Sequence, residues 1–262
     1  MNSQLSIRTT VKLNNGIEMP VLGLGVWQMS EGVETEHSVL WALEAGYRLI
    51  DTARLYGNEV SVGSAVRKSG IFRKEIFVTT KLWPTDFFRV RAAFQKSLKN
   101  LGLAYIDLYL IHWPMPLIKT GIWKDLEKIY REGLVRAIGV SNYNVNQLEA
   151  LVTTANIAPV VNQVKFNPFS YKKELLDFCK SKNIALEAYS PLARGKKLND
   201  PIIADMARKY NKTPAQIMTR WSLQHGVVAI PKSSHKERII ENANVFDFQI
   251  EVDDVKLLDN LS

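Results

Sequence analysis

The feature that most constrains the fold is a pattern repeated along almost the whole chain: a short apolar run, a polar or glycine-bearing loop, and an amphipathic stretch. This alternation is typical of βα units. Eight apolar runs predict strands over 21–27, 47–53, 76–81, 106–113, 135–142, 160–166, 184–190 and 227–233. Between them, segments such as 34–46, 85–102 and 172–183 carry apolar residues at helical spacing and predict helices.

Eight parallel strands with intervening helices in 262 residues predict an α/β fold, a single (β/α)8 TIM barrel. The alternative is a doubly wound sheet, whose dinucleotide fingerprint needs a third glycine where this chain has Gln28. Ahead of the first strand, Asn15 and Gly16 stand between alternating apolar residues and predict a β-hairpin that caps the bottom of the barrel. We find no linker or low-complexity tract, so we expect one domain over 1–262.

Composition narrows the possible functions. No apolar run reaches the roughly 20 residues that a membrane span needs, and the N-terminal segment lacks the pattern of a signal peptide. The single cysteine, Cys179, excludes an intrachain disulfide and a cysteine-cluster metal site, and we expect it in a helix core. The net charge is +8, but Lys and Arg are scattered. We therefore expect a cytoplasmic protein that binds no metal, no membrane and no nucleic acid.

Polar side chains end three consecutive predicted strands. Asp51, Lys81 and His112 are spaced 30 and 31 residues apart, one βα unit each time. The carboxyl ends of barrel strands share one face, so these side chains can converge there. Asp51 follows an apolar pair and needs a partner, for which Lys81 is the natural candidate. The alternative is that Asp51 caps a helix.

Tyr56 follows Asp51 by five residues and can serve as a proton donor. A phenol titrates near pH 10, and a neighbouring ammonium lowers that pKa by favouring the phenolate. Held by Asp51, Lys81 could supply this ammonium. We predict that these three residues form a tuned general acid and that neutral His112 orients a carbonyl oxygen.

Seven segments then carry a family resemblance: "IDTARLYGNE", "TTKLW", "DLYLIHWP", "GLVRAIGVSN", "VNQVKFNPF", "AYSPL" and "IPKSSHKERIIEN". Because these segments occur in the same order and at compatible spacing, the chain resembles the aldo-keto reductase superfamily over nearly its whole length. The resemblance implies an oxidoreductase that moves a hydride from a nicotinamide cofactor to small aldehydes, α-dicarbonyls, keto acids or open-chain sugars. It also implies the catalytic tetrad Asp51, Tyr56, Lys81 and His112, with Tyr56 protonating the carbonyl oxygen.

The resemblance further implies a groove for the cofactor. The positions matched to its nicotinamide end are Ser141, Asn142, Gln163 and Tyr189. The positions matched to its pyrophosphate and adenosine ends are Ser190, Leu192, Lys232, Ser233, Arg238, Glu241 and Asn242. A basic cluster opening a helix suits a phosphate. NADPH is the expected cofactor, with NADH as a weaker alternative.

The substrate pocket implied by the resemblance is aromatic, with Trp27, Trp83 and Trp113 each just beyond a strand end. Lys165 and Asn167 depart from the glutamate and histidine of many relatives. The segment 114–122 is short and the sequence ends without the long tail that covers the substrate in many members, so we expect an open pocket. We also expect a monomer.

Two other functions remain possible at this point. A cofactor-binding regulatory or structural protein could use the same scaffold, since a fold does not fix a function; the intact tetrad argues against it. Steroid double-bond reduction is disfavoured, because His112 stands where those relatives carry glutamate.

Overall fold

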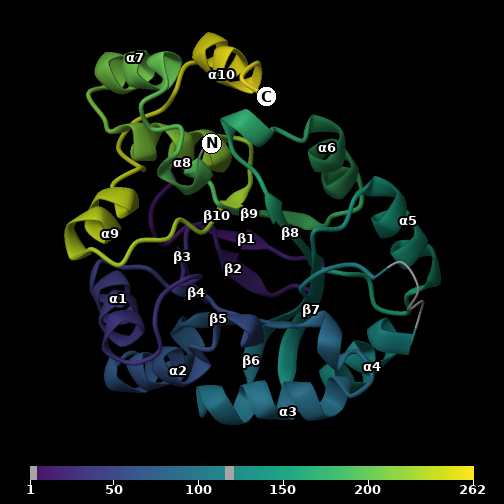
Figure 1. Cartoon of the computed structure of the whole chain (residues 1–262). Helices are drawn as coiled ribbons and strands as arrows, with labels where there is room; N and C mark the ends of the chain where they lie inside the picture. Colours follow the sequence, from purple (N-terminus) through teal and green to yellow (C-terminus); the bar gives the residue numbers. More distant parts are fainter. Residues whose placement is uncertain (1–4, 116–120) are drawn as a thin grey trace.

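Eight parallel strands form a closed ring at the centre of the molecule (Figure 1). The structure is a computed structural model that describes residues 5–115 and 121–262. In chain order the strands are β3 (Leu24–Gly25), β4 (Leu49–Asp51), β5 (Phe77–Leu82), β6 (Ile106–Ile111), β7 (Val135–Ser141), β8 (Val161–Lys165), β9 (Ala185–Tyr189) and β10 (Val228–Ala229). Leu22 bridges Ala229 in parallel, which closes the sheet into a barrel. The eight predicted strands and the predicted barrel are confirmed.

Helices surround this ring (Figure 1). They are α1 (Val33–Glu44), α2 (Glu59–Lys68), α3 (Val90–Leu101), α4 (Gly121–Arg131), α5 (Val145–Thr154), α6 (Lys173–Ser181), α7 (Pro201–Tyr210), α8 (Pro214–Gln224), α9 (Lys236–Ala243) and α10 (Val252–Asp259). Cys179 is buried in α6, as expected. Within the described ranges, no helix combines the length and the apolar character needed to cross a bilayer.

One predicted helix starts later than its sequence pattern indicates. The pattern covers 85–102, but α3 begins at Val90. Before it, Pro84–Asp86 forms a separate 3-10 turn, η3, and the buried carboxylate of Asp86 pairs with Arg54 and Arg89. Proline at the first position of η3 and this ion cluster fix a turn where the apolar spacing alone suggests a continuous helix.

The barrel has an apolar layer inside and another outside the strands. Every residue of β5 and β6 is buried, as expected for parallel strands covered on both faces. The inner layer includes Leu49, Phe77 and Leu108, and the larger outer layer packs the strands against the helices. This packing fixes the strands and with them the residues at their ends.

The predicted N-terminal hairpin is confirmed. It consists of β1 (Thr10–Lys12) and β2 (Glu18–Pro20), joined by a turn in which Gly16 has φ +85°. Leu13 and Met19 pack into the inner apolar layer, and Asn15 donates a hydrogen bond to the carbonyl oxygen of Arg136 at the start of β7. The hairpin therefore closes the amino-terminal end of the barrel and leaves function to the opposite end.

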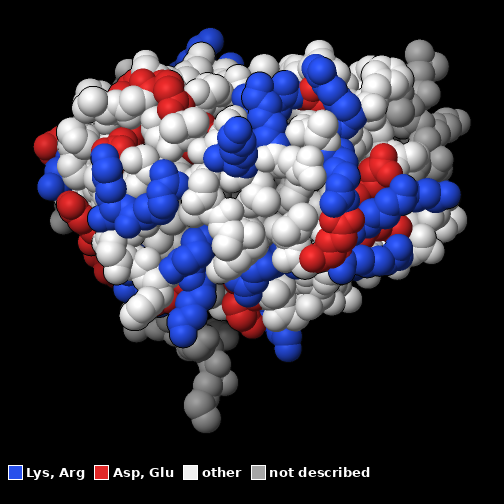
Figure 2. Space-filling model, turned by 90° about the horizontal axis from the view of Figure 1, so that it is seen from below, with Lys and Arg blue, Asp and Glu red and all other residues white. Residues whose placement is uncertain are grey.

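Figure 2 shows one side of the molecule with its charged residues. On this face, Lys and Arg side chains lie among uncharged residues and several Asp and Glu groups (Figure 2). They do not form one continuous stripe in this view.

Candidate active site

A cleft of about 830 Å³ lies at the carboxyl ends of the strands. All but two of the predicted site residues line it: Trp27, Asp51, Tyr56, His112, Trp113, Ser141, Asn142, Gln163, Tyr189, Ser190, Leu192, Lys232, Ser233, Arg238, Glu241 and Asn242. The two others, Lys81 and Trp83, are not among the lining residues. Lys81 is fully buried, and the ring of Trp83 packs 5.0 Å from that of His112. The barrel thus gathers residues that are far apart in sequence.

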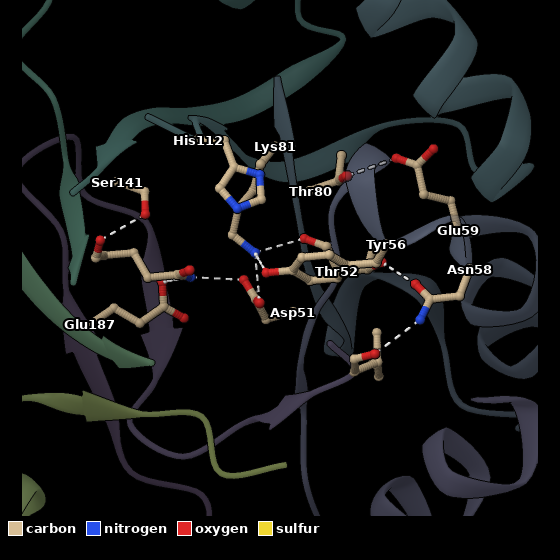
Figure 3. A network of polar contacts seen from close by, with 12 residues as sticks. Asp51, Thr52, Tyr56, Asn58, Glu59, Thr80, Lys81, His112, Ser141 and Glu187 are labelled. Atoms are coloured by element: carbon tan, nitrogen blue, oxygen red, sulfur yellow. Dashed lines mark hydrogen bonds and ion pairs between the residues drawn. The ribbon is translucent and has the colours of Figure 1, made fainter. Parts of the chain in front are cut away.

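Lys81 connects Asp51 to Tyr56 (Figure 3). Its Nζ donates to Oδ1 of Asp51 at 2.7 Å and to the carbonyl oxygen of Thr52 at 2.8 Å, and lies 3.3 Å from Oη of Tyr56. The partner required by the buried aspartate is therefore Lys81. The alternative that Asp51 caps a helix is wrong, because its second oxygen, Oδ2, accepts a hydrogen bond from Gln163 instead.

Two polar residues after Tyr56 hold its turn in place. Tyr56 ends the short helix η1 (Arg54–Tyr56), which stops at Gly57 with φ +72°. Asn58 accepts a hydrogen bond from Thr52 at 2.7 Å and donates to the carbonyl oxygen of Val26 at 2.9 Å (Figure 3). Glu59 accepts one from Thr80 at 2.7 Å. Sequence reasoning missed these positioning roles, although both residues lie within three positions of Tyr56.

Burial changes the titration of Tyr56. Burial raises its pKa to about 12, although the charge of Lys81 acts in the opposite direction. The expectation that the pKa of Tyr56 is lowered is therefore wrong for this structure. Desolvation raises the pKa of the phenol by more than the ammonium of Lys81 lowers it. For Lys81, burial lowers the pKa, but Asp51 and Tyr56 outweigh it and the net pKa is raised. At neutral pH the site holds a protonated phenol beside an ammonium.

His112 is neutral. Burial, followed by the charge of Lys81, lowers its pKa to about 3. Its ring meets that of Tyr56 nearly edge-on, with centroids 5.7 Å apart, and its backbone carbonyl accepts a hydrogen bond from Asn142 at 3.0 Å. A neutral imidazole can donate one hydrogen bond without adding charge, which agrees with the expectation from the sequence.

A second group of polar residues connects the ends of β7, β8 and β9. The hydroxyl of Ser141 donates to the carbonyl oxygen of Gln163 at 2.8 Å, and the hydroxyl of Tyr189 donates to Oδ1 of Asn142 at 2.9 Å. Asn142 has φ +65°, in the left-handed region that non-glycine residues rarely adopt. These bonds fix the side chains of the cleft floor before any ligand binds.

The loop that follows β9 extends toward the end of β3, the first strand of the barrel. Ser190, Ala193 and Arg194 have φ values of +49°, +48° and +57°. Such strained backbone is concentrated at functional sites. The guanidinium of Arg194 lies 4.5 Å from the ring centroid of Trp27, a cation–π contact at the cleft. Sequence reasoning missed Arg194; its only signal was a cation in a glycine-bearing loop after a strand end.

At the other end of the cleft, basic side chains stand at the start of a helix. Lys232 and Ser233 precede α9, and Arg238 lies in its first turn. The hydroxyl of Ser233 accepts a hydrogen bond from the backbone N–H of His235 at 3.2 Å. Glu241 accepts one from Thr213 at 2.6 Å. Cations combined with the free N–H groups of a helix start can hold an anionic group.

The departures from the family pattern have structural roles or lie apart from the site. Lys165 is exposed at the end of β8. Asn167 donates to the carbonyl oxygen of Ser190 at 3.0 Å and so supports the strained loop. Within the short segment 114–122, residues 116–120 lie outside the described residues. Trp113, the predicted pocket residue just before this segment, is 44% exposed at the rim of the cleft.

Known proteins resemble this chain along nearly its whole length. The model of the aldo/keto reductase family matches residues 21–262. The chain is 49% identical to a glyoxal reductase of Bacillus subtilis, over 98% of this chain and 94% of the relative. It superposes on the crystal structure of an aldo/keto reductase from Brucella melitensis with a TM-score of 0.92 at 46% identity, covering 97% of this chain and 99% of that one.

A second similar structure was determined in complex with NADP. The Bombyx mori aldo-keto reductase in complex with NADP superposes with a TM-score of 0.90 at 36% identity, over 98% of this chain and 93% of that one. From the barrel, the family match and these likenesses along the whole chain, we conclude that the chain belongs to the aldo/keto reductase family.

Proposed function

We propose that this protein uses NADPH to reduce the carbonyl group of small aldehydes and ketones, with α-dicarbonyls such as glyoxal as the first substrate class to test. The observation that carries the proposal is the buried Lys81, which contacts both Asp51 and Tyr56 at the wall of a cleft that reaches Lys232 and Arg238. The name of the Bacillus subtilis relative, glyoxal reductase, supports the substrate class.

The shape and charge of the cleft fit a dinucleotide. Its volume of about 830 Å³ is large for a small carbonyl compound alone. Asn142, Gln163 and Tyr189 would hold the nicotinamide, and Lys232 and Arg238 would hold the 2′-phosphate at the start of α9. When bound, the cofactor supplies the hydride for the carbonyl carbon.

Residues of this chain would donate the proton and stabilise the charge that remains. Tyr56, with its pKa raised to about 12, is protonated at neutral pH, and Oη can donate the proton to the carbonyl oxygen as negative charge develops there. The ammonium of Lys81, 3.3 Å from Oη, stabilises the phenolate that remains. Neutral His112 can donate a hydrogen bond that orients the carbonyl oxygen. The net reaction consumes a carbonyl, NADPH and a proton and yields an alcohol and NADP⁺.

The test is turnover of a panel containing glyoxal, methylglyoxal, a short keto acid and an aldose, followed by the loss of NADPH absorbance. We expect reduction of at least the α-dicarbonyls, and slower reduction when NADH replaces NADPH. If NADPH binds but no carbonyl in the panel is reduced, the enzyme proposal is wrong and a cofactor-binding regulatory protein is the better account.

A further inference from the structure

A second buried carboxyl group lies beside the ion pair of the site. Glu187 is in the middle of β9, where the strand register places it opposite Gln163 of β8. It is 0% exposed, and its side chain lies near Asp51 (Figure 3). The tetrad does not include Glu187, and Tyr56, Lys81 and His112 make no hydrogen bond to it in the described residues. A fully buried acid at this place needs a physical account.

Gln163 connects the two carboxyl groups. Its Nε2 donates to Oε2 of Glu187 at 2.8 Å and to Oδ2 of Asp51 at 2.8 Å. Both amide hydrogens of Gln163 are therefore donated to buried carboxyl oxygens. A flipped amide would place its oxygen against the carboxylate of Asp51, which can only accept hydrogen bonds. Glu187 accepts the second N–H of Gln163, so the two carboxyl groups together favour this orientation. In that orientation the amide oxygen, Oε1, is the polar group of Gln163 left for a ligand in the cleft.

Burial and the neighbouring carboxylate of Asp51 favour the neutral form of Glu187. Burial, followed by the charge of Asp51, raises the pKa of Glu187 to about 8, against the hydrogen bond from Gln163 and the charge of Lys81. The ammonium of Lys81 is already bound to Asp51 and to the carbonyl oxygen of Thr52. The titratable groups facing Glu187 are thus Asp51 from β4, Lys81 from β5 and Tyr56 from η1, and no second cation is among them.

We propose that Glu187 is a positioning residue for carbonyl reduction: as a neutral acid it holds Gln163 with its amide oxygen toward the nicotinamide carboxamide and leaves Asp51 as the only carboxylate beside Lys81. The carboxyl of Glu187 acts through Gln163 and touches neither substrate nor cofactor. The inference rests on the proposed function, because it assigns the carboxamide to Gln163.

A pH dependence follows from this arrangement. When Glu187 loses its proton above about pH 8, a second negative charge appears near the phenol. That charge is one of the causes that raise the pKa of Tyr56, and it disfavours transfer of its proton. The kcat for carbonyl reduction should therefore fall as the pH rises through this range.

Two substitutions separate the charge of Glu187 from its hydrogen bond. Glu187→Gln keeps an acceptor for Nε2 of Gln163 but cannot ionise. We expect near-normal kcat at pH 7 and an alkaline decline that is lost or moved upward by at least about one pH unit. Glu187→Ala removes one of the two acceptors that hold the amide of Gln163, so its side chain is held less firmly and the Kd for NADPH should rise roughly tenfold. Glu127→Gln, a buried acid on α4 remote from the cleft, is the matched control and should change neither property.

The decisive experiment measures NADPH binding by fluorescence, kcat against pH, and the infrared C=O band of protonated carboxyl groups in the wild type and the variants. We expect the wild type to lose one such band between about pH 7 and pH 9 and Glu187→Gln to lack it. The proposal is overturned if Glu187→Gln keeps both the band and the alkaline decline, or if Glu187→Ala folds and binds NADPH as the wild type does. Should Glu187→Ala not fold, Glu187→Gln decides. A wild type without reductase activity would refute the proposed function separately, since the band and NADPH binding do not depend on turnover.

Discussion

Lys81 shows at the scale of one residue how burial and charge set the chemistry of the site. Its ammonium is fully buried, yet it stays charged because Asp51 lies 2.7 Å away. Desolvation also raises the pKa of Tyr56 to about 12, which makes its ionised form less favourable than that of an exposed phenol. Removing Asp51 would leave an unpaired buried cation, which is strongly unfavourable. The aspartate at the end of an apolar strand is therefore there to hold the charge of the lysine.

The neutral state of His112 gives a prediction at this scale. Because its pKa is lowered to about 3, its NMR signals should not titrate between pH 5 and pH 8, and His112→Asn identifies them. The folded pKa lies below the usual value near 6.5, so the stability that this histidine contributes is present above pH 6.5 and is lost as the pH falls toward 3. A titration midpoint between pH 6 and pH 7 would contradict the assignment of a neutral hydrogen-bond donor.

At the scale of elements, the sequence predicts the strands well because each is a short apolar run bounded by turn residues. The positions of Asp51, Lys81 and His112 at strand ends follow from the same pattern. Three features do not follow from it. The late start of α3 depends on the ion pairs of Asp86, the pKa of Tyr56 depends on burial, and Glu187 meets Gln163 from 24 residues away. Each depends on tertiary contacts that a local pattern does not contain.

The start of α9 carries a prediction about cofactor choice. If Arg238 holds the 2′-phosphate, Arg238→Ala should raise the Kd for NADPH roughly tenfold or more and leave the Kd for NADH almost unchanged, because a hydrogen bond to a charged group is lost only with NADPH. Fluorescence titration with both nucleotides measures this. Lys236→Ala is the matched control, since Lys236 starts the same helix but pairs with Glu44 at 3.6 Å. Equal losses for both nucleotides would place the phosphate elsewhere.

At the scale of the whole molecule, the two ends of the barrel differ in structure: one is closed by packing and ion pairs, and the other is open to the cleft. The amino-terminal end is closed by the hairpin and by Asp107, which is fully buried and pairs with Arg73 at 2.6 Å and Arg136 at 2.9 Å. The carboxyl end carries the cleft. Stability and activity should therefore respond to different substitutions, as the barrel fold predicts.

Asp107→Ala tests this separation. We expect the free energy of unfolding in urea to fall by roughly 3 kcal/mol. This value is at the lower end of the range for a broken buried ion pair, because both arginines are partly exposed. The kcat/KM of the folded protein should be unchanged. Asp125→Ala removes an exposed pair with Lys128 and should cost less than about 0.5 kcal/mol. A large loss of kcat/KM in folded Asp107→Ala would show that the two ends are coupled.

The central claim, that Tyr56 protonates a carbonyl oxygen in a nicotinamide-dependent reduction, is tested most directly by single-turnover reduction of glyoxal by NADPH with the wild type and Tyr56→Phe. The account predicts that both proteins bind NADPH with similar affinity and that Tyr56→Phe reduces glyoxal about 10²–10⁴-fold more slowly. A Tyr56→Phe variant that binds NADPH and reduces glyoxal at the wild-type rate would contradict it.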